Sequence, residues 1–142
     1  MDAASSRSTP WHLWVVAVLT LFWNGSGAVT IAMAQMGNPL DMDPNEVAYY
    51  ANQPLWLVLA TDLALVLPIA AGVALLLRSR SAAWLFALAL AALVVTNAYD
   101  VAAGTSLALV DQGWRTLEIV LVAIALLQFA YARTMKKRGV LR

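Results

Sequence analysis

The chain has 142 residues, enough for one domain, and 62% of them are hydrophobic while only 12% are charged. Soluble domains contain about 45–50% apolar and about 25% charged residues. A small soluble fold would leave much of this apolar surface in water, so the composition excludes a water-soluble domain and indicates a protein embedded in lipid.

Four apolar runs follow one another along the chain, each of about 20 residues, the length that crosses the hydrocarbon core as a helix. They cover residues 11–35, 55–77, 82–103 and 114–131. Only the four residues 78–81 separate the second run from the third, which predicts an antiparallel helical hairpin. The fold class that we predict is all-α, an integral membrane four-helix bundle that forms a single transmembrane domain over residues 1–142.

The first run also has features of a cleaved signal peptide. Arg7 precedes it, and small residues at 24–28 resemble a cleavage zone. Apolar character resumes over residues 29–34, however, so we expect a retained membrane span.

The loop after the first run contains the pattern of a capping box. Asp43 is the expected N-cap, Pro44 occupies the first helical position and Glu46 the third. This predicts a short helix over residues 44–51 that lies on the outer membrane surface, either as a partial roof over the bundle or as an ordered loop without that role.

The basic residues predict the orientation, because cytoplasmic loops of membrane proteins are enriched in Lys and Arg. Of the nine Lys and Arg residues, all but Arg115 lie on one side of four spans. The opposite loops carry Asp41, Asp43, Glu46 and Asp111. We therefore expect a multi-pass protein of the bacterial inner membrane with both termini in the cytoplasm.

Polar residues within the spans are the candidate binding residues, because an ionisable group in a membrane span is costly and marks a functional site by default. Asn97 and Asp100 share one helix face, and so do Arg115 and Glu118. The full set that we expect in one outward-facing polar layer is Asp62, Asn97, Asp100, Glu118, Arg115 and Asn24.

The charges of this layer do not balance. Asp62, Asp100 and Glu118 face one cation, Arg115, which requires protonation of a carboxyl group, entry of water, or a cationic ligand or partner group. A purely structural interpretation is also open, in which Arg115 and Glu118 form an interfacial pair. In that case the asparagines hold helices together by hydrogen bonds.

Three stretches resemble a known family: residues 21–27, residues 43–56 with their two tyrosines, and the turn at 75–80. They are similar to small four-span bacterial inner-membrane proteins, labelled either "sugar transporter" or uncharacterised, and more loosely to the DoxX-like group. The resemblance covers nearly the whole chain and implies transport, but it assigns no binding residues.

Three functions follow from these observations. The first is binding or transport of a small polar solute through the polar layer. The second is a non-catalytic accessory subunit of a larger respiratory or photosynthetic membrane complex, or a homo-oligomer. The third, a quinone-linked enzyme, has no positive support, and we expect no enzyme activity.

The chemistry-bearing residue types limit the sites further. Cysteine is absent and His12 is the one histidine, which excludes disulfides, thiolate nucleophiles and the usual zinc sites. His12 stands beside Trp11, and we interpret it as an interfacial residue. We expect no cofactor, no metal and no nucleic-acid partner.

Overall fold

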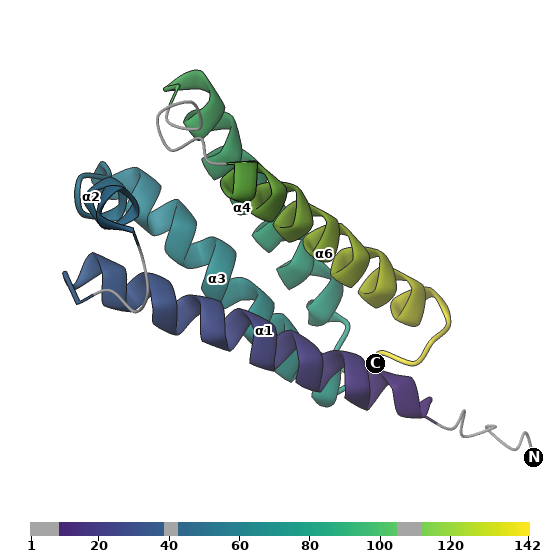
Figure 1. Cartoon of the computed structure of the whole chain (residues 1–142). Helices are drawn as coiled ribbons and strands as arrows, with labels where there is room; N and C mark the ends of the chain where they lie inside the picture. The colour runs from purple at the N-terminus through teal and green to yellow at the C-terminus, as the bar shows by residue number, and fades with distance from the viewer. Residues whose placement is uncertain (1–8, 39–42, 105–111) are drawn as a thin grey trace, which may run out of the picture.

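The computed structural model of the chain describes residues 9–38, 43–104 and 112–142, the side chains of residues 112–115 excepted. Within these ranges every regular element is an α-helix (Figure 1). The helices are α1 (Trp11–Gln35), α2 (Pro44–Ala51), α3 (Leu55–Leu76), α4 (Ser81–Ala102) and α6 (Gln112–Lys137). The prediction of an all-α fold is confirmed, and α1, α3, α4 and α6 are long and apolar enough to cross a membrane.

The helix boundaries follow the apolar runs closely, with one exception. α6 continues to Lys137 rather than ending near Tyr131. Hydropathy falls where Arg133 begins the basic segment, but Lys and Arg are good helix formers. Lys136 and Lys137 in the last turn also interact favourably with the helix dipole.

Helices α1, α3 and α6 end in a similar way, with a left-handed residue just after the helix. Gly37 (φ 72°) follows α1, and the amide of Asn38 donates to the carbonyl of Met33 at 2.9 Å. Gly139 (φ 71°) follows α6, and the next amide, that of Val140, donates to the carbonyl of Met135 at 3.1 Å. Arg78 (φ 57°) has this conformation after α3, and the amide of Ser79 donates to Ala74 at 2.8 Å. This is the Schellman arrangement, and after α3 it produces the predicted hairpin with α4.

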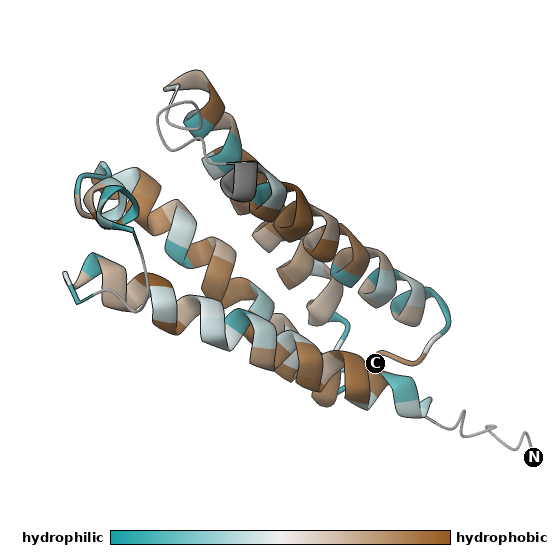
Figure 2. Cartoon of the chain, viewed as in Figure 1, coloured by the Kyte–Doolittle hydropathy of each residue, from teal (hydrophilic) through white to brown (hydrophobic). Residues whose placement is uncertain are grey.

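The helices are arranged in sequence order around the bundle, with α3 packed against both α1 and α4, and α6 packed against α4 (Figure 1). Large apolar side chains such as Phe22, Ile119 and Leu127 are exposed on the outside, and apolar residues recur along all four long helices in Figure 2. Such a surface fits lipid and not water.

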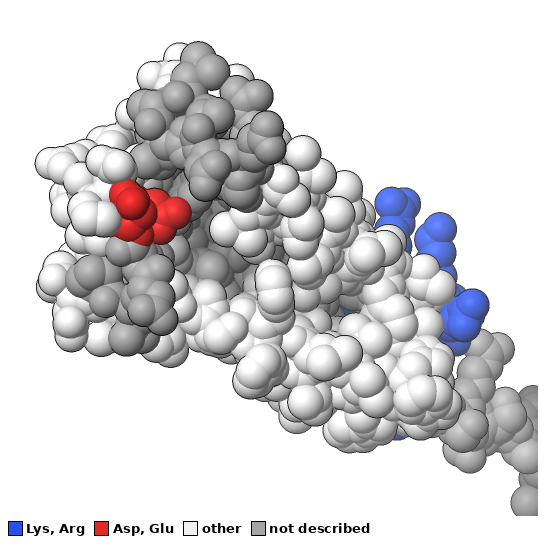
Figure 3. All heavy atoms as spheres, in the orientation of Figure 1, with Lys and Arg blue, Asp and Glu red and all other residues white. Residues whose placement is uncertain are grey.

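The two ends of the bundle carry opposite charges, as Figure 3 shows on one face. We call the end that holds the α3–α4 turn and the C-terminal end of α6 the basic end, since Arg78, Arg80 and Lys136 lie there. The other is the acidic end, where α2 carries Glu46.

The buried apolar core lies in the basic half of the bundle. It contains Leu13 and Ala17 of α1, Leu75 of α3, Phe86 of α4 and Met135 of α6, all at most 2% exposed. Two side-chain hydrogen bonds join α1 to α6 at the same end. The hydroxyl of Tyr131 and Nδ1 of His12 lie 2.6 Å apart, and Nε2 of Gln128 donates to Oγ1 of Thr20 at 3.3 Å.

Gly72 of α3 allows α1 to approach closely. A Cβ atom added there would lie 3.0 Å from two side-chain atoms of Leu21 and 3.3 Å from Cγ2 of Thr20. At Gly25 of α1, by contrast, an added Cβ meets nothing within 4 Å. Helices in lipid associate through close contacts of this kind, so Gly72 stabilises the α1–α3 pair.

Replacement of Gly72 by valine should therefore destabilise the bundle by about 1–3 kcal/mol through overpacking. The matched control is Gly25→Val, which makes the same change in helix propensity without the clash. Unfolding in detergent, followed by circular dichroism, measures both. Equal stability of the two variants would show that α1 and α3 do not depend on this contact.

Candidate functional site

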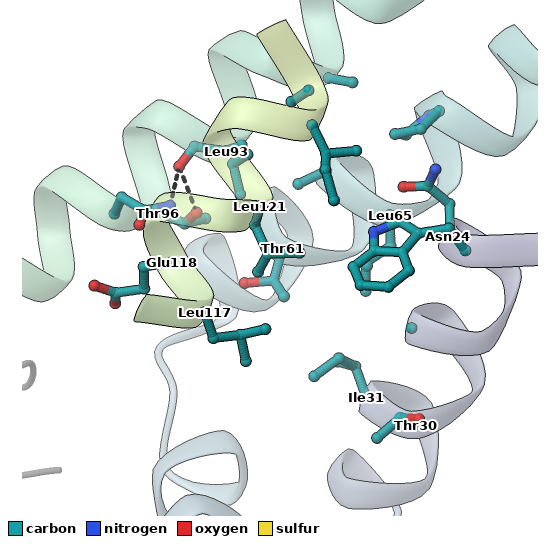
Figure 4. A pocket seen from close by; sticks show the side chains of 18 of the residues that line it. Asn24, Thr30, Ile31, Thr61, Leu65, Leu93, Thr96, Leu117, Glu118 and Leu121 are labelled. Carbon is teal, nitrogen blue, oxygen red and sulfur yellow. Dashed lines mark hydrogen bonds between the residues drawn. The ribbon is translucent and has the colours of Figure 1, made fainter. Parts of the chain in front are cut away.

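A cavity of about 480 Å³ occupies the acidic half of the bundle. All four long helices line it, each with one face, and α2 contributes to its outer part. On α4 most lining residues are spaced three or four apart, as one side of a helix requires, with Thr96 and Asn97 as an adjacent pair. Figure 4 shows side chains from these helices around the space. The lining residues that it labels are Asn24, Thr30, Ile31, Thr61, Leu65, Leu93, Thr96, Leu117, Glu118 and Leu121.

The lining changes from apolar to polar along the bundle. Phe86 belongs both to the core and to the cavity, so it marks the inner end. From Phe86 to Asp100 the lining face of α4 extends about 20 Å, at 1.5 Å per residue. Ala89 and Leu93 lie between them, whereas Thr96, Asn97 and Asp100 form the outer part. A molecule in the cavity would therefore meet mainly apolar residues of α4 inside and polar ones at the acidic end, while Gln128 of α6 adds a polar side chain at the inner end.

Helix α2 forms for local reasons and then docks on α4. The Asp43 carboxylate accepts a hydrogen bond from the amide of Asn45 at 2.8 Å, and the Glu46 carboxylate accepts one from the amide of Asp43 at 3.3 Å. This confirms the predicted capping box and the predicted helix over 44–51. The hydroxyl of Tyr49 donates to Oδ1 of Asp100 at 2.6 Å, so α2 covers the outer part of the cavity.

Two tyrosines of α2 remain protonated in this environment. Burial is the main cause that raises the pKa of Tyr49, and the hydrogen bond to Asp100 raises it further. Burial likewise raises the pKa of Tyr50, with a smaller contribution from the negative charge of Glu46. Tyr49 is thus a neutral donor that cannot compensate the charge of the Asp100 carboxylate.

Four of the six candidate residues from the sequence line the cavity: Asn24, Asn97, Asp100 and Glu118. Asp62 does not line it, because its Oδ1 accepts a hydrogen bond from Nε2 of Gln35 of α1 at 3.2 Å. The side chain of Arg115 lies outside the described residues. The carboxylate of the cavity on α4 is therefore Asp100, and Asp62 lies outside the cavity.

Each of the two asparagines uses its side-chain amide nitrogen within its own helix. Nδ2 of Asn24 donates to the carbonyl of Thr20 at 2.9 Å, and Nδ2 of Asn97 donates to that of Leu93 at 2.7 Å. Each bond lies within one helix. The amide groups are therefore partly satisfied before any ligand arrives.

The structure adds residues to the site that the sequence pattern did not identify as binding residues. They include Trp23 of α1, Glu46 and Tyr49 of α2, Gln53 after α2, and Thr96 of α4. The capping box, which indicated a possible roof, was the one signal that pointed toward α2. The side chain of Gln53 is of interest because its Oε1 is buried without a hydrogen-bond partner among the described residues.

No group of three or more His, Cys, Asp or Glu residues within the described ranges could hold a metal ion. The arrangement of buried carboxylate, tyrosine hydroxyls and apolar walls is typical of a small-molecule binding site. Comparison of the chain with protein-family models, with curated proteins and with solved structures gives no match.

Removal of the Tyr49 hydroxyl tests how α2 is held. Tyr49→Phe should lower stability by about 1.5–3 kcal/mol, the contribution of a hydrogen bond to a charged group. Thermal unfolding in detergent near neutral pH measures the loss. An unchanged midpoint would mean that α2 is held by other contacts.

The same variant should alter the pH dependence of stability. The folded chain keeps the Tyr49 proton above pH 10.0, the ordinary pKa of tyrosine, whereas the unfolded chain releases it. Stabilisation is therefore complete below pH 10.0 and is lost as the pH rises further. Between about pH 9 and about pH 11, melting midpoints should fall less steeply in Tyr49→Phe than in the wild-type protein, and equal slopes would contradict this assignment.

Proposed function

We propose that this protein is a multi-pass protein of the bacterial inner membrane that binds a small solute from the outer side. The solute would enter the cavity at the acidic end, between the α1–α3 pair and the α4–α6 pair. The observation that carries this proposal is the cavity of about 480 Å³, which lies within the range of small-molecule sites.

The buried core supports binding of the solute from one side of the membrane. Leu13, Leu75 and Phe86 fill the basic half of the bundle, so packed side chains separate the cavity from the basic end in the part of the chain that the structure describes. Transport, which the resemblance to the sugar-transporter family implies, would require these residues to separate. Binding in an outward-facing cavity needs no such change.

The distribution of basic residues supports the direction in which the cavity opens. Arg78 and Arg80 occupy the α3–α4 turn, and Lys136 and Lys137 end α6 at the same end. By the positive-inside rule this end faces the cytoplasm. The cavity then opens toward the outside, beneath α2.

Reporter fusions test this orientation. A cytoplasmic reporter inserted in the α3–α4 turn or fused after Arg142 should be active, whereas the same reporter inserted before α2 should be inactive. A periplasmic reporter should give the reverse pattern. Opposite sides for the turn and the carboxyl end would overturn both the topology and the direction of binding.

Filling the cavity tests binding itself. Ala125 of α6 lines the cavity, whereas Ala123 of the same helix is exposed and does not. We expect at least one class in a panel of sugars, amino acids, organic cations and organic anions to raise the melting temperature of the wild-type protein. Ala125→Phe should abolish that shift because its ring occupies the site, and Ala123→Phe should preserve it. A panel without any shift in the wild-type protein would contradict the proposal.

A further inference from the structure

The described charged residues that line the cavity have one sign. The described lining residues include three carboxylates, Glu46, Asp100 and Glu118, and none of them is a Lys, Arg or His. Glu46 belongs to the capping box of α2, and Glu118 takes part in a further interaction. Asp100 is therefore the carboxylate most able to interact with a ligand.

Asp100 is a buried carboxylate in an apolar span. The residue is 9% exposed, and its Oδ1 accepts a hydrogen bond from the neutral hydroxyl of Tyr49. A carboxylate can accept several hydrogen bonds, and a buried charge is costly unless an opposite charge compensates it. A ligand with a cationic group beside Asp100 would supply that charge.

Aromatic rings surround the same outer part of the cavity. Tyr49 and Tyr50 lie edge to face with their centroids 5.0 Å apart, and both line the cavity. A cation near such rings is attracted by their negative faces. The rings therefore favour a cationic ligand, as Asp100 does.

The inner walls determine the rest of the ligand. Leu65, Pro68, Phe86 and Ile124 make most of this wall apolar. Gln128 and Asn24 also line the cavity, but each already donates a hydrogen bond within the protein, so a sugar would find few partners for its hydroxyl groups there, which is unfavourable. An apolar body gains from burial there.

We propose that the cavity binds an organic cation whose apolar body lies against the inner walls and whose positive charge lies beside Asp100. This inference rests on the proposed function, since it names the class of solute that the outward-facing cavity binds. Asp100 would act as the charge-recognising residue, with Tyr49 holding its carboxylate in place.

Two ions of equal shape and opposite charge test the inference on the wild-type protein. Binding of tetraphenylphosphonium and of tetraphenylborate is measured on full-length protein in phosphatidylcholine nanodiscs, with empty nanodiscs subtracted. We expect saturable binding of the phosphonium and none of the borate. Equal binding of both ions, or saturable binding of glucose without the phosphonium, would overturn the cation assignment while leaving a binding cavity in place.

Asp100→Asn is the matching variant, because it removes the charge but keeps an oxygen that can accept from Tyr49. Loss of a buried charge partner should weaken phosphonium binding about thirtyfold or more. Asp62→Asn is the control, since Asp62 lies outside the cavity. This variant should bind the phosphonium with the affinity of the wild-type protein. Unchanged affinity in Asp100→Asn would refute the role of Asp100.

The two proposals fail in different ways. If neither ion nor any solute of the panel binds, the proposed function itself fails. If Asp100→Asn does not fold, as judged by its melting curve, the comparison of the two ions on the wild-type protein decides alone. Ala125→Phe should reduce phosphonium binding, and persistence of full affinity would place the cation elsewhere on the protein.

Discussion

Close packing at the basic end is the constraint on which the cavity depends. Lipid provides no hydrophobic drive between helices, so helices stay together where small residues allow contact. Gly72 of α3 provides that contact against Leu21 of α1. Toward the acidic end the helices enclose the cavity, whose lining mixes large side chains such as Leu93 and Leu121 with small ones such as Ala64 and Ala125. The contact at Gly72 and the packed core of the basic half therefore hold the helices together beside a cavity that they do not fill.

The last residues of the chain strengthen the same end. The amide of Arg80 donates to the carbonyl of Arg142 at 3.1 Å, and the amide of Arg142 donates to that of Arg78 at 2.6 Å. Val140 and Leu141, just before, are buried against the core. The tail thus ties the end of α6 to the α3–α4 turn. Because the basic end is held by backbone hydrogen bonds as well as by packing, a change of shape on ligand binding would occur at the acidic end, where α2 is held by side chains.

The sequence was sufficient for the elements whose causes are local. Bilayer thickness sets the length of an apolar run, and the capping box at Asp43 needs only neighbouring residues. The end of α6 was missed because hydropathy detects lipid contact and not helix formation, and Lys137 is helical without being apolar. The contact between Tyr49 and Asp100 joins residues far apart in the chain. No periodicity reveals such a contact, because it depends on how α2 lies over the bundle.

Asp62 and Asp100 show why depth in the membrane does not by itself identify a site. Sequence position gives how far along a helix a carboxylate lies, but its role depends on the rotation of that helix about its axis. On α3 the rotation brings Asp62 to the amide of Gln35, across the seam with α1. On α4 it brings Asp100 to the cavity, with a neutral phenol as its donor. Both carboxylates carry the cost of an ionisable group in a span. Of these two carboxylates, only Asp100 lies where a small molecule could supply the missing positive charge, and the proposed selectivity for a cation rests on this difference.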